Sequence, residues 1–377
     1  MKRGKRLLHM RTMKKISMNF ETLIWLEALT PKQALLYSYV YDYLKKRDFN
    51  VIVTTREHEF TSKILKNRDT RSVIVGKYGG KELSSKLYAS LNRQEGLFLL
   101  FKNLNINPLV HSSFTSPDSC RVAFGLGVPI VVLTDSPHSD KVNRLTLPLA
   151  ETIIVPLCIE NKIRKYAISP SRLITFDGVF EVIWCANFKP SLKPLKMLNV
   201  EPYNYCIIRP PEVKASYYNY DIKQDIFLKL ATKTSEHLTV IYYPRYRDQV
   251  FIAKKIAEKI PNIKILETSL DMQSLEKYAS FVLTGGSTIA QEAAILGTPS
   301  ITCFPQKTEI TNYLEKKGFP IIHVSSTEML EKVVLDLIKN SEIYREKTKK
   351  LIDKLENPLP LIVDEISKLA SKRSHLQ

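Results

Sequence analysis

The sequence predicts an α/β protein of two domains, each built on a parallel β-sheet, and three observations support this prediction. The chain has 377 residues, which suits two domains of ordinary size. Short apolar runs alternate with helical patterns along most of its length, as in parallel sheets covered by helices on both faces. A proline-containing stretch near the middle interrupts this alternation, which then restarts.

The first domain is predicted over residues 19–178. Its expected strands are short runs rich in aliphatic and β-branched residues, at Leu23–Leu26, Val51–Thr54, Ser72–Val75, Pro108–His111, Ile130–Leu133, Thr152–Val155 and Leu173–Phe176. Its expected helices have apolar residues at helical spacing, at Lys32–Lys46, Glu57–Lys66, Lys81–Leu104, Pro117–Leu126 and Lys141–Leu147.

Residues 179–201 break the rhythm and are predicted to link the two domains. The second domain is predicted over residues 202–355. Its expected strands are Tyr205–Ile208, Leu238–Tyr242, Ile263–Leu266, Phe281–Leu283, Ser300–Cys303 and Ile321–Val324. Its expected helices are Ile222–Lys233, Gln249–Lys259, Leu275–Tyr278, Thr288–Leu296, Ile310–Lys316 and Thr327–Lys339. The tail at 359–377 is amphipathic and is predicted to form a helix that packs back onto the first domain.

The net charge of +18 is uneven, because residues 1–18 hold seven Lys or Arg and no acid. This leader is predicted to be a disordered tail, or to precede a true start at Met13 or Met18. It lacks the apolar core of a secretory signal, and no apolar run is long enough to span a membrane, so a cytoplasmic protein is expected. The charge suits an anionic substrate or anionic lipid headgroups. A nucleic-acid partner is not expected, because no nucleic-acid-binding signature is present.

Neither a disulfide framework nor a metal site is predicted. The cysteines stand singly in the sequence, at Cys120, Cys158, Cys185, Cys206 and Cys303. No cluster of His and acidic residues has the spacing of a metal site, and no cofactor is expected.

The most informative segment is LTGGSTIAQEAAILGTP, which is typical of a strand, a glycine turn and a helix. Gly285 and Gly286 permit a sharp turn and the close approach of a ligand. Ser287 and Thr288 stand where a helix N-cap is expected, and a helix N-terminus suits a phosphate. Glu292, about one turn into the helix, can accept hydrogen bonds from a ribose diol. The same pattern occurs without a ligand in many α/β folds, and neither a P-loop nor a dinucleotide fingerprint is present.

Two arginines are expected beside this turn. Arg209 and Arg245 follow the first two strands of the second domain, and the ends of neighbouring parallel strands meet at one edge of a sheet. With the helix start at Ser287 and Thr288, they would form a clamp for a diphosphate. The alternative is a pair of solvated arginines at the mouth of a cleft.

Polar residues after the strands of the first domain are candidates for catalysis and for contacts with a substrate or acceptor. Asp135 and His138 could share or orient a proton, and the alternative is a helix cap and a surface histidine. Arg144 could pair with Asp135 or hold a phosphate. The candidate substrate and acceptor residues are Thr30, Lys32, Gln33, Arg56, Ser112, Ser113, Ser116, Asn143 and Arg144.

Several segments resemble the DUF354 family, a largely archaeal group related to the GT-B superfamily. They are WLEALTPKQALL, SSFTSPDSCRVAFGLGVPIVVLTDSPHS, VNRLTLPLA, FDGVFEVIW, RPPEVKASYY and GGSTIAQEAAILGTP, within residues 20–340. The resemblance implies a GT-B-like α/β fold, in which two Rossmann-like domains with parallel sheets face a central cleft. A nucleotide-sugar would bind in that cleft. The family itself has no assigned reaction.

Within that superfamily, the segment around Glu292 is similar to the nucleotide-binding motif of UDP-N-acetylglucosamine 2-epimerase, and Glu292 falls on the ribose-binding position. The acid–base positions of that enzyme fall on Ser112, near Thr134 or Asp135, near Asp140 or Lys141, and near Pro210. Two of these four lack an acid or base, and epimerisation by elimination needs such groups. The resemblance therefore carries over nucleotide binding and not the epimerase chemistry.

Three hypotheses follow. The first is a GT-B-type glycosyltransferase with a UDP-sugar donor and an acceptor such as a cell-surface polysaccharide or glycolipid precursor, with Asp135 or His138 as the base. The second is a sugar-nucleotide epimerase or hydrolase. The third is a non-catalytic protein that binds a nucleotide or nucleic acid. The sequence leaves open the base, the sugar, the acceptor and the oligomeric state.

Overall fold

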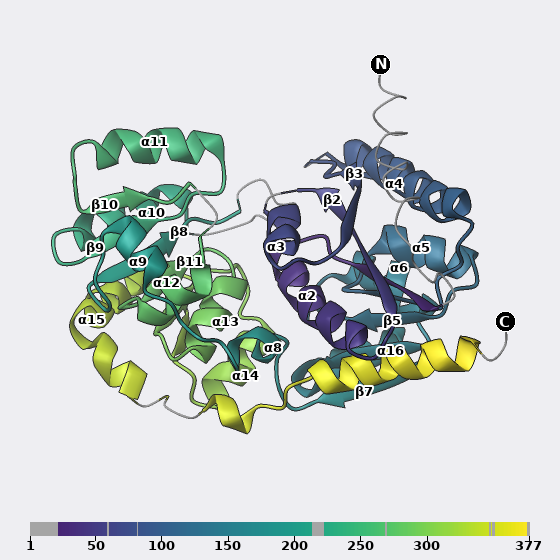
Figure 1. Ribbon diagram of the computed structural model, residues 1–377. Helices are drawn as coiled ribbons and strands as arrows, with labels where there is room; N and C mark the ends of the chain where they lie inside the picture. The colour runs from purple at the N-terminus through teal and green to yellow at the C-terminus, as the bar shows by residue number, and fades with distance from the viewer. Residues whose placement is uncertain are drawn as a thin grey trace, which may run out of the picture. The chain divides into compact units, whose positions relative to one another are not determined.

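The computed structural model describes residues 22–58, 60–80, 82–212, 222–267, 270–346, 348 and 351–374. The leader predicted at residues 1–18 lies outside the described residues. The chain splits into two compact units, one formed by Met1–Phe176 with Pro358–Gln377 and the other by Asp177–Asn357. Each unit has its own parallel sheet, flanked by helices (Figure 1).

The first unit is built on a seven-stranded parallel sheet in the order β3-β2-β1-β4-β5-β6-β7. The strands are β1 (Leu23–Glu27), β2 (Asn50–Glu57), β3 (Ser72–Lys77), β4 (Val110–Ser113), β5 (Ile130–Leu133), β6 (Thr152–Pro156) and β7 (Arg172–Phe176). The strand order reverses at β1, where Leu26 pairs with Val53 on one side and with Ser112 on the other. Ligands of open parallel sheets bind beyond the carboxyl ends of the strands at such a switch point.

The helices of the first unit connect these strands. They are α2 (Pro31–Lys45), α3 (Thr61–Asn67), α4 (Leu83–Leu104), α5 (Pro117–Gly125), α6 (Asp140–Thr146) and α7 (Glu160–Ile163), with the 3-10 turns η2 (Leu147–Leu149), η3 (Leu157–Ile159) and η4 (Arg164–Tyr166). The positions at which two of these helices begin follow from the local sequence. Thr30 caps α2 and Ser116 caps α5 through side-chain oxygens, and each is followed by a proline at the first helical position.

The last helix, α16 (Leu359–Ser374), belongs to the first unit, where it packs against α2 and β4 (Figure 1, yellow). Its apolar face, including Ile362 and Ile366, is fully buried. An ion pair of 2.6 Å joins Arg47 to Asp364 at the surface. The amphipathic pattern of the tail and the apolar surface beneath it explain this return of the chain.

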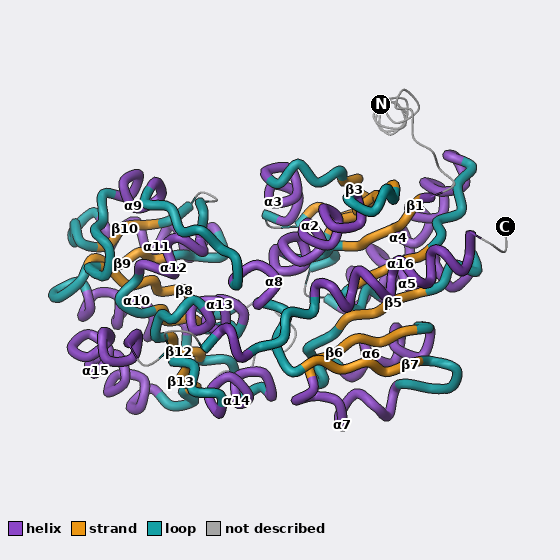
Figure 2. Tube along the Cα trace, turned by 60° about the horizontal axis from the view of Figure 1, so that its bottom comes forward, coloured by secondary structure: helices purple, strands orange, loops and turns teal. Residues whose placement is uncertain are grey.

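The second unit is built on a six-stranded parallel sheet in the order β10-β9-β8-β11-β12-β13. Figure 2 labels β10, β9, β8, β12 and β13 of this sheet. The strands are β8 (Tyr205–Arg209), β9 (Thr239–Tyr242), β10 (Ile263–Ile265), β11 (Val282–Thr284), β12 (Ser300–Thr302) and β13 (Ile321–His323). The switch point lies between β8 and β11, where Arg209 pairs with Thr284.

The helices of the second unit are α8 (Val182–Cys185), α9 (Lys193–Leu198), α10 (Gln224–Thr234), α11 (Arg247–Ala257), α12 (Met272–Tyr278), α13 (Thr288–Ile295), α14 (Glu309–Lys316) and α15 (Thr327–Glu346), followed by the 3-10 turn η5 (Ile352–Lys354). The predicted linker at residues 179–201 lies within this unit and contains α8 and α9. Leu195 and Val200 pack in one buried cluster with Tyr205 of β8. The prolines interrupt the pattern of these residues but do not keep them out of the core.

The predicted fold class is confirmed: both halves are parallel-sheet, Rossmann-like α/β units. Within the described part of the chain, no helix combines the length and the apolar character needed to cross a membrane.

Candidate functional site

The glycine turn after β11 is shaped by contacts that only glycine permits. The N–H of Gly285 donates to the carbonyl of Arg209 over 3.0 Å, which holds the turn against the end of β8. A Cβ atom on Gly285 would lie 2.4 Å from Cα of Pro211. Because backbone atoms cannot yield like a flexible side chain, no larger residue fits here without moving the strand end.

Gly286 brings Arg245 to the turn. Its N–H donates to Oγ1 of Thr284 over 3.0 Å, and its carbonyl accepts a 2.9 Å hydrogen bond from Oγ1 of Thr302. A Cβ on Gly286 would lie 3.2 Å from Nη2 of Arg245. The guanidinium group of Arg245 therefore lies directly against the turn, at the start of α13.

Arg209 and Arg245 supply two positive charges at this sheet edge. Arg209 ends β8 and is buried, with its guanidinium carbon 4.0 Å from the ring centroid of Tyr243. Nη1 of Arg245 lies 3.7 Å from a carboxylate oxygen of Glu212. A guanidinium group is planar by resonance, and stacking on an aromatic ring orients it, which suits the recognition of a phosphate oxygen pair.

The start of α13 differs from the sequence prediction in one respect. Ser287 is the N-cap residue, but it has helical dihedral angles and its side chain makes no capping hydrogen bond. Thr288 is the first helical residue. The first N–H groups of a helix have no partner within the helix, so this start keeps the donor character that a phosphate site needs.

Glu292 is held by a tryptophan. Its carboxylate oxygen Oε1 accepts a 2.8 Å hydrogen bond from the indole Nε1 of Trp184, on α8. Trp184 is fully buried and Glu292 is 7% exposed. One edge of the carboxylate is therefore fixed by the protein. We define the glycine-turn site as Gly285, Gly286, Ser287, Thr288, Glu292, Arg209 and Arg245.

A second carboxyl group lies behind this site. Glu276 of α12 is fully buried, and neither of its carboxyl oxygens has a hydrogen-bond partner among the described residues. Burial, and to a lesser degree the charge of Glu292, raises the pKa of Glu276 well above its usual value. Sequence reasoning missed both Glu276 and the role of Trp184, since neither follows a strand.

The first unit has a buried ionic network at its own switch point. Glu27, the last residue of β1, is fully buried and receives a 2.7 Å hydrogen bond from Nη2 of Arg93. Ser116 donates to the same oxygen over 3.2 Å, and Thr54 donates to the other. Glu27 and Arg93 were not among the sequence candidates. The charge of Glu27 at a strand end was a local signal, but the burial of Arg93 on α4 had none.

The structure places the two predicted acid–base residues, Asp135 and His138, in the segment that follows β5. Asp135 forms an ion pair with Lys32 and accepts a 2.9 Å hydrogen bond from Ser136. His138 is exposed on a turn. Arg144 pairs with Asp140 over 3.0 Å rather than with Asp135. The cation beside Asp135 is thus Lys32, which sequence reasoning had assigned to substrate contacts.

Several other predicted contact residues have hydrogen bonds within the fold. Gln33 accepts from the N–H of Leu29 over 2.7 Å. Ser112 shares a 3.1 Å hydrogen bond with Tyr37, and Ser113 lies 3.2 Å from Sγ of Cys120. Asn143 donates to the carbonyl of Ser136 over 3.1 Å. Thr30 and Ser116 cap helices, so for these residues local structure accounts for the polar side chain.

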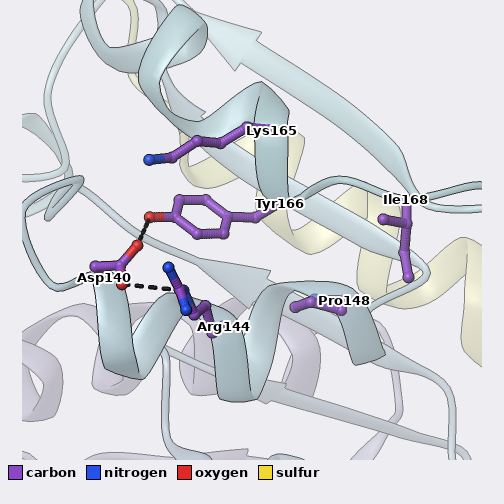
Figure 3. A pocket seen from close by; sticks show the side chains of 6 residues that line it. All are labelled: Asp140, Arg144, Pro148, Lys165, Tyr166 and Ile168. Atoms are coloured by element: carbon purple, nitrogen blue, oxygen red, sulfur yellow. Dashed lines mark hydrogen bonds and ion pairs between the residues drawn. The ribbon is translucent and has the colours of Figure 1, made fainter.

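A pocket of about 350 Å³ lies elsewhere on the first unit (Figure 3). Its lining residues are Asp140, Arg144, Pro148, Lys165, Tyr166 and Ile168. The hydroxyl of Tyr166 donates to Asp140 over 2.6 Å, and this bond is the main reason why the pKa of Asp140 is lowered. Arg144 is the one residue of this pocket that the sequence had proposed as a contact. In the described part of the chain, no three His, Cys, Asp or Glu residues are grouped so as to hold a metal ion.

Two parallel-sheet Rossmann-like units, the second with a glycine turn and two arginines at its switch point, define a GT-B-like protein. The chain belongs to the family described as "Protein of unknown function (DUF354)", whose model matches residues 23–371.

The comparisons with individual proteins agree with this assignment. The chain is 28% identical to the uncharacterized protein MJ0665 of Methanocaldococcus jannaschii, over 83% of this chain and 91% of that protein. It is similar in structure to the UDP-GlcNAc 2-epimerase of Neisseria meningitidis bound to UDP-GlcNAc, with a TM-score of 0.68, 16% identity, and coverage of 92% and 100% of the two chains. It is also similar to the glycotransferase of kitacinnamycin, with a TM-score of 0.61, 10% identity, and coverage of 92% and 98%. At these identities the structural similarity establishes the fold.

Proposed function

We propose that the protein is a GT-B-type glycosyltransferase that takes its sugar from a UDP-linked donor bound at the glycine-turn site. The observation that carries the proposal is the fixed carboxylate of Glu292, on the helix that follows the glycine turn. Its Oε1 accepts a 2.8 Å hydrogen bond from Trp184 of α8. A carboxylate fixed on one edge can accept hydrogen bonds from the two hydroxyls of a ribose on its other edge. The UDP-GlcNAc bound to the Neisseria epimerase makes a uridine nucleotide the first ligand to test.

The diphosphate of the donor would be held by Arg209, Arg245 and the start of α13. In glycosyl transfer the diphosphate leaves with the bonding electrons, so negative charge grows on its oxygens. Preorganised guanidinium groups and helix N–H groups stabilise such developing charge. Gly286 has no side chain, so a diphosphate could approach the backbone of the turn beside Arg245, whose Nη2 would lie 3.2 Å from a Cβ at this position.

The acceptor would meet the first unit, where we propose Asp135 or His138 as the base that removes the proton of its hydroxyl. Asp135 has Lys32 as its ion-pair partner, and a base must be free to take up a proton. His138 is exposed on its turn, where an acceptor can reach it, and imidazole is the side chain that most often acts as a general base. An acceptor of the cell-surface polysaccharide or glycolipid type would suit the positive charge of the chain.

A sugar-nucleotide epimerase or hydrolase is the second candidate. It is favoured by the TM-score of 0.68 to a UDP-GlcNAc 2-epimerase, against 0.61 to a glycotransferase. Incubation of the protein with UDP-sugars in deuterated water would separate the two functions. Deuterium at a ring carbon without any acceptor would support the epimerase, whereas transfer that requires an acceptor would support the transferase.

The donor site is tested by thermal unfolding with UDP and a panel of nucleotide-sugars. A ligand at 100 times its dissociation constant stabilises the folded state by about 2.7 kcal/mol. Glu292→Ala should remove most of the stabilisation by UDP. Glu365→Ala is the matched control, because Glu365 is a comparably buried glutamate (8% exposed) in the first unit. UDP binding that survives in Glu292→Ala would exclude this site, and no response to any nucleotide would favour a non-catalytic role.

A further inference from the structure

Two arginines of the first unit, Arg56 at the end of β2 and Arg93 on α4, have buried hydrogen-bond donors without a described acceptor. Arg93 is 1% exposed, and its Nη2 binds Glu27. Its Nε lies 3.9 Å from Asp118, within ion-pair range but too far for a hydrogen bond. The buried Nε and Nη1 of Arg93 thus have no acceptor among the described residues.

Arg56, on β2, also has a buried donor without a described acceptor. Its guanidinium carbon lies 5.0 Å from the ring centroid of Tyr78, and its buried Nε has no acceptor within the described part of the chain. None of the described carboxylates forms an ion pair with Arg56. Its positive charge is therefore not neutralised by a direct contact with a described acid.

The two arginines lie at the same place in the fold. Burial lowers the pKa of Arg56, and the charge of Arg93 lowers it further, whereas the charges of Glu27 and Asp118 raise it, so these four charged groups lie in the same region of the first unit. Gly76, at the end of β3, lies against the stem of Arg93, since a Cβ on Gly76 would be 3.3 Å from Cβ of Arg93. Tyr78 continues this segment and stacks on His58 with 4.4 Å between ring centroids. We call Arg56, Arg93 and Tyr78 the Arg56–Arg93 cluster.

Buried N–H groups without acceptors are rare in folded proteins, and two adjacent cations repel each other. An oxyanion would remove both costs. A phosphate group has oxygens enough to meet both guanidiniums at once, and arginine is the residue best matched to it. A Cβ on Gly80 would meet no atom within 4 Å, so open space adjoins the segment that follows β3.

We propose that the Arg56–Arg93 cluster is a binding site for a phosphate group. We assign this phosphate group to the acceptor of the sugar, which would then be a phosphorylated compound. This assignment rests on the proposed function. The site itself does not, because it lies in the first unit and shares no residue with the glycine-turn site.

The test is calorimetric titration of the full chain with inorganic phosphate at constant ionic strength. The wild type should bind phosphate, and Arg56→Gln should bind it about 10- to 100-fold more weakly, the loss expected for a charged hydrogen bond. Arg56→Lys should also bind weakly, because it keeps the charge but not the planar fork. Arg164→Gln is the matched control, an exposed arginine paired with Glu160 in the same unit, and it should bind as the wild type does.

Three results would overturn the proposal: no binding by the wild type, equal weakening by Arg164→Gln, or unchanged binding by Arg56→Lys. Thermal unfolding of each variant shows whether it is folded, and Arg93 itself is left intact because Glu27 depends on it.

The two proposals fail separately. Phosphate should bind equally well when UDP saturates the protein and when Glu292 is replaced by Ala. If UDP displaces phosphate, the phosphate occupies the glycine-turn site and the cluster is not a site. If phosphate binds through Arg56 while no nucleotide binds, the cluster stands and the proposed donor site fails.

Discussion

The indole Nε1 of Trp184 donates a hydrogen bond of 2.8 Å to Oε1 of Glu292, across 108 positions of sequence. Both side chains are buried in the second unit, so this bond fixes the carboxylate with little competition from water. In the proposed donor site, it determines which edge of Glu292 faces a ribose.

Trp184→Phe should weaken UDP binding by about tenfold, because the ring is kept but the hydrogen bond that orients Glu292 is lost. Calorimetric titration with UDP measures the change. The protein has two tryptophans, and the other provides a matched control. Trp25 is also buried and donates to Thr54 over 2.6 Å, but in the first unit. Equal losses in Trp25→Phe and Trp184→Phe would show a general effect of stability.

Gly285→Ala should lower the stability of the protein, whereas Gly286→Ala should lower its affinity for UDP. A Cβ at 285 meets the backbone of Pro211 at 2.4 Å, so we expect a loss of about 1–3 kcal/mol in the free energy of unfolding. The nearest atom to a Cβ at 286 is the flexible end of Arg245, at 3.2 Å, and Oγ1 of Thr284 lies at an ordinary contact distance of 3.8 Å. Gly286→Ala should therefore keep its stability and lose UDP affinity. Denaturant unfolding and UDP titration of both variants provide the measurements, and equal stability losses would contradict the assignment.

Glu27→Gln should destabilise the first unit by about 3 kcal/mol, because it leaves the buried charge of Arg93 without its closest partner. Asp364→Asn removes a partner of Arg47 in an exposed ion pair and should cost less than about 1 kcal/mol. Denaturant unfolding compares the two variants. A similar small cost for both would mean that Asp118, 3.9 Å from Arg93, suffices as its counter-charge.

The stability of the first unit should fall in mild acid because of His111. This side chain is fully buried, and burial lowers its pKa from 6.5 to about 3. Its Nδ1 lies 3.1 Å from the carbonyl of Trp25, so Nδ1 carries the proton and Nε2 accepts from Ser119. The unfolded chain binds a proton below pH 6.5 that the folded chain excludes, so stability is full above pH 6.5 and is lost as the pH falls toward 3.

The slope contributed by His111 should approach about 1.4 kcal/mol per pH unit within that range. Unfolding of the wild type and of His111→Asn at several pH values measures it. The difference in stability between them should shrink as the pH falls from 6.5 toward 3, and a constant difference would exclude His111 as the cause.

The sequence was a good guide wherever the signal was local. The strand and helix ranges follow from the period of apolar residues, which is repeated within each element. Gly285, Gly286 and the helix start could be recognised together because a turn and a helix start need particular residues within a few positions. The position of Arg245 beside this turn could also be predicted, because the carboxyl ends of parallel strands lie at the same edge of a sheet.

The sequence did not indicate which of the polar residues after strands form hydrogen bonds within the fold. Thr30, Gln33, Ser112 and Ser113 follow strands as ligand-binding residues do, yet their hydrogen bonds close within the first unit. The charge pattern also did not predict that Asp135 forms its ion pair with Lys32 and that Arg144 pairs with Asp140.

The sequence by itself determined two α/β units, the order of their elements and the glycine turn with Glu292, because each depends on residues that are neighbours in the chain. Tertiary structure alone decided that Arg93 of α4 meets Glu27 across 66 positions, that Trp184 holds Glu292, and that the buried Glu276 has no hydrogen-bond partner among the described residues. The physical reason is that burial and charge pairing depend on which helix covers which strand end. The apolar pattern fixes which face of a helix is buried, but the polar partners that this face meets are set by packing between distant segments.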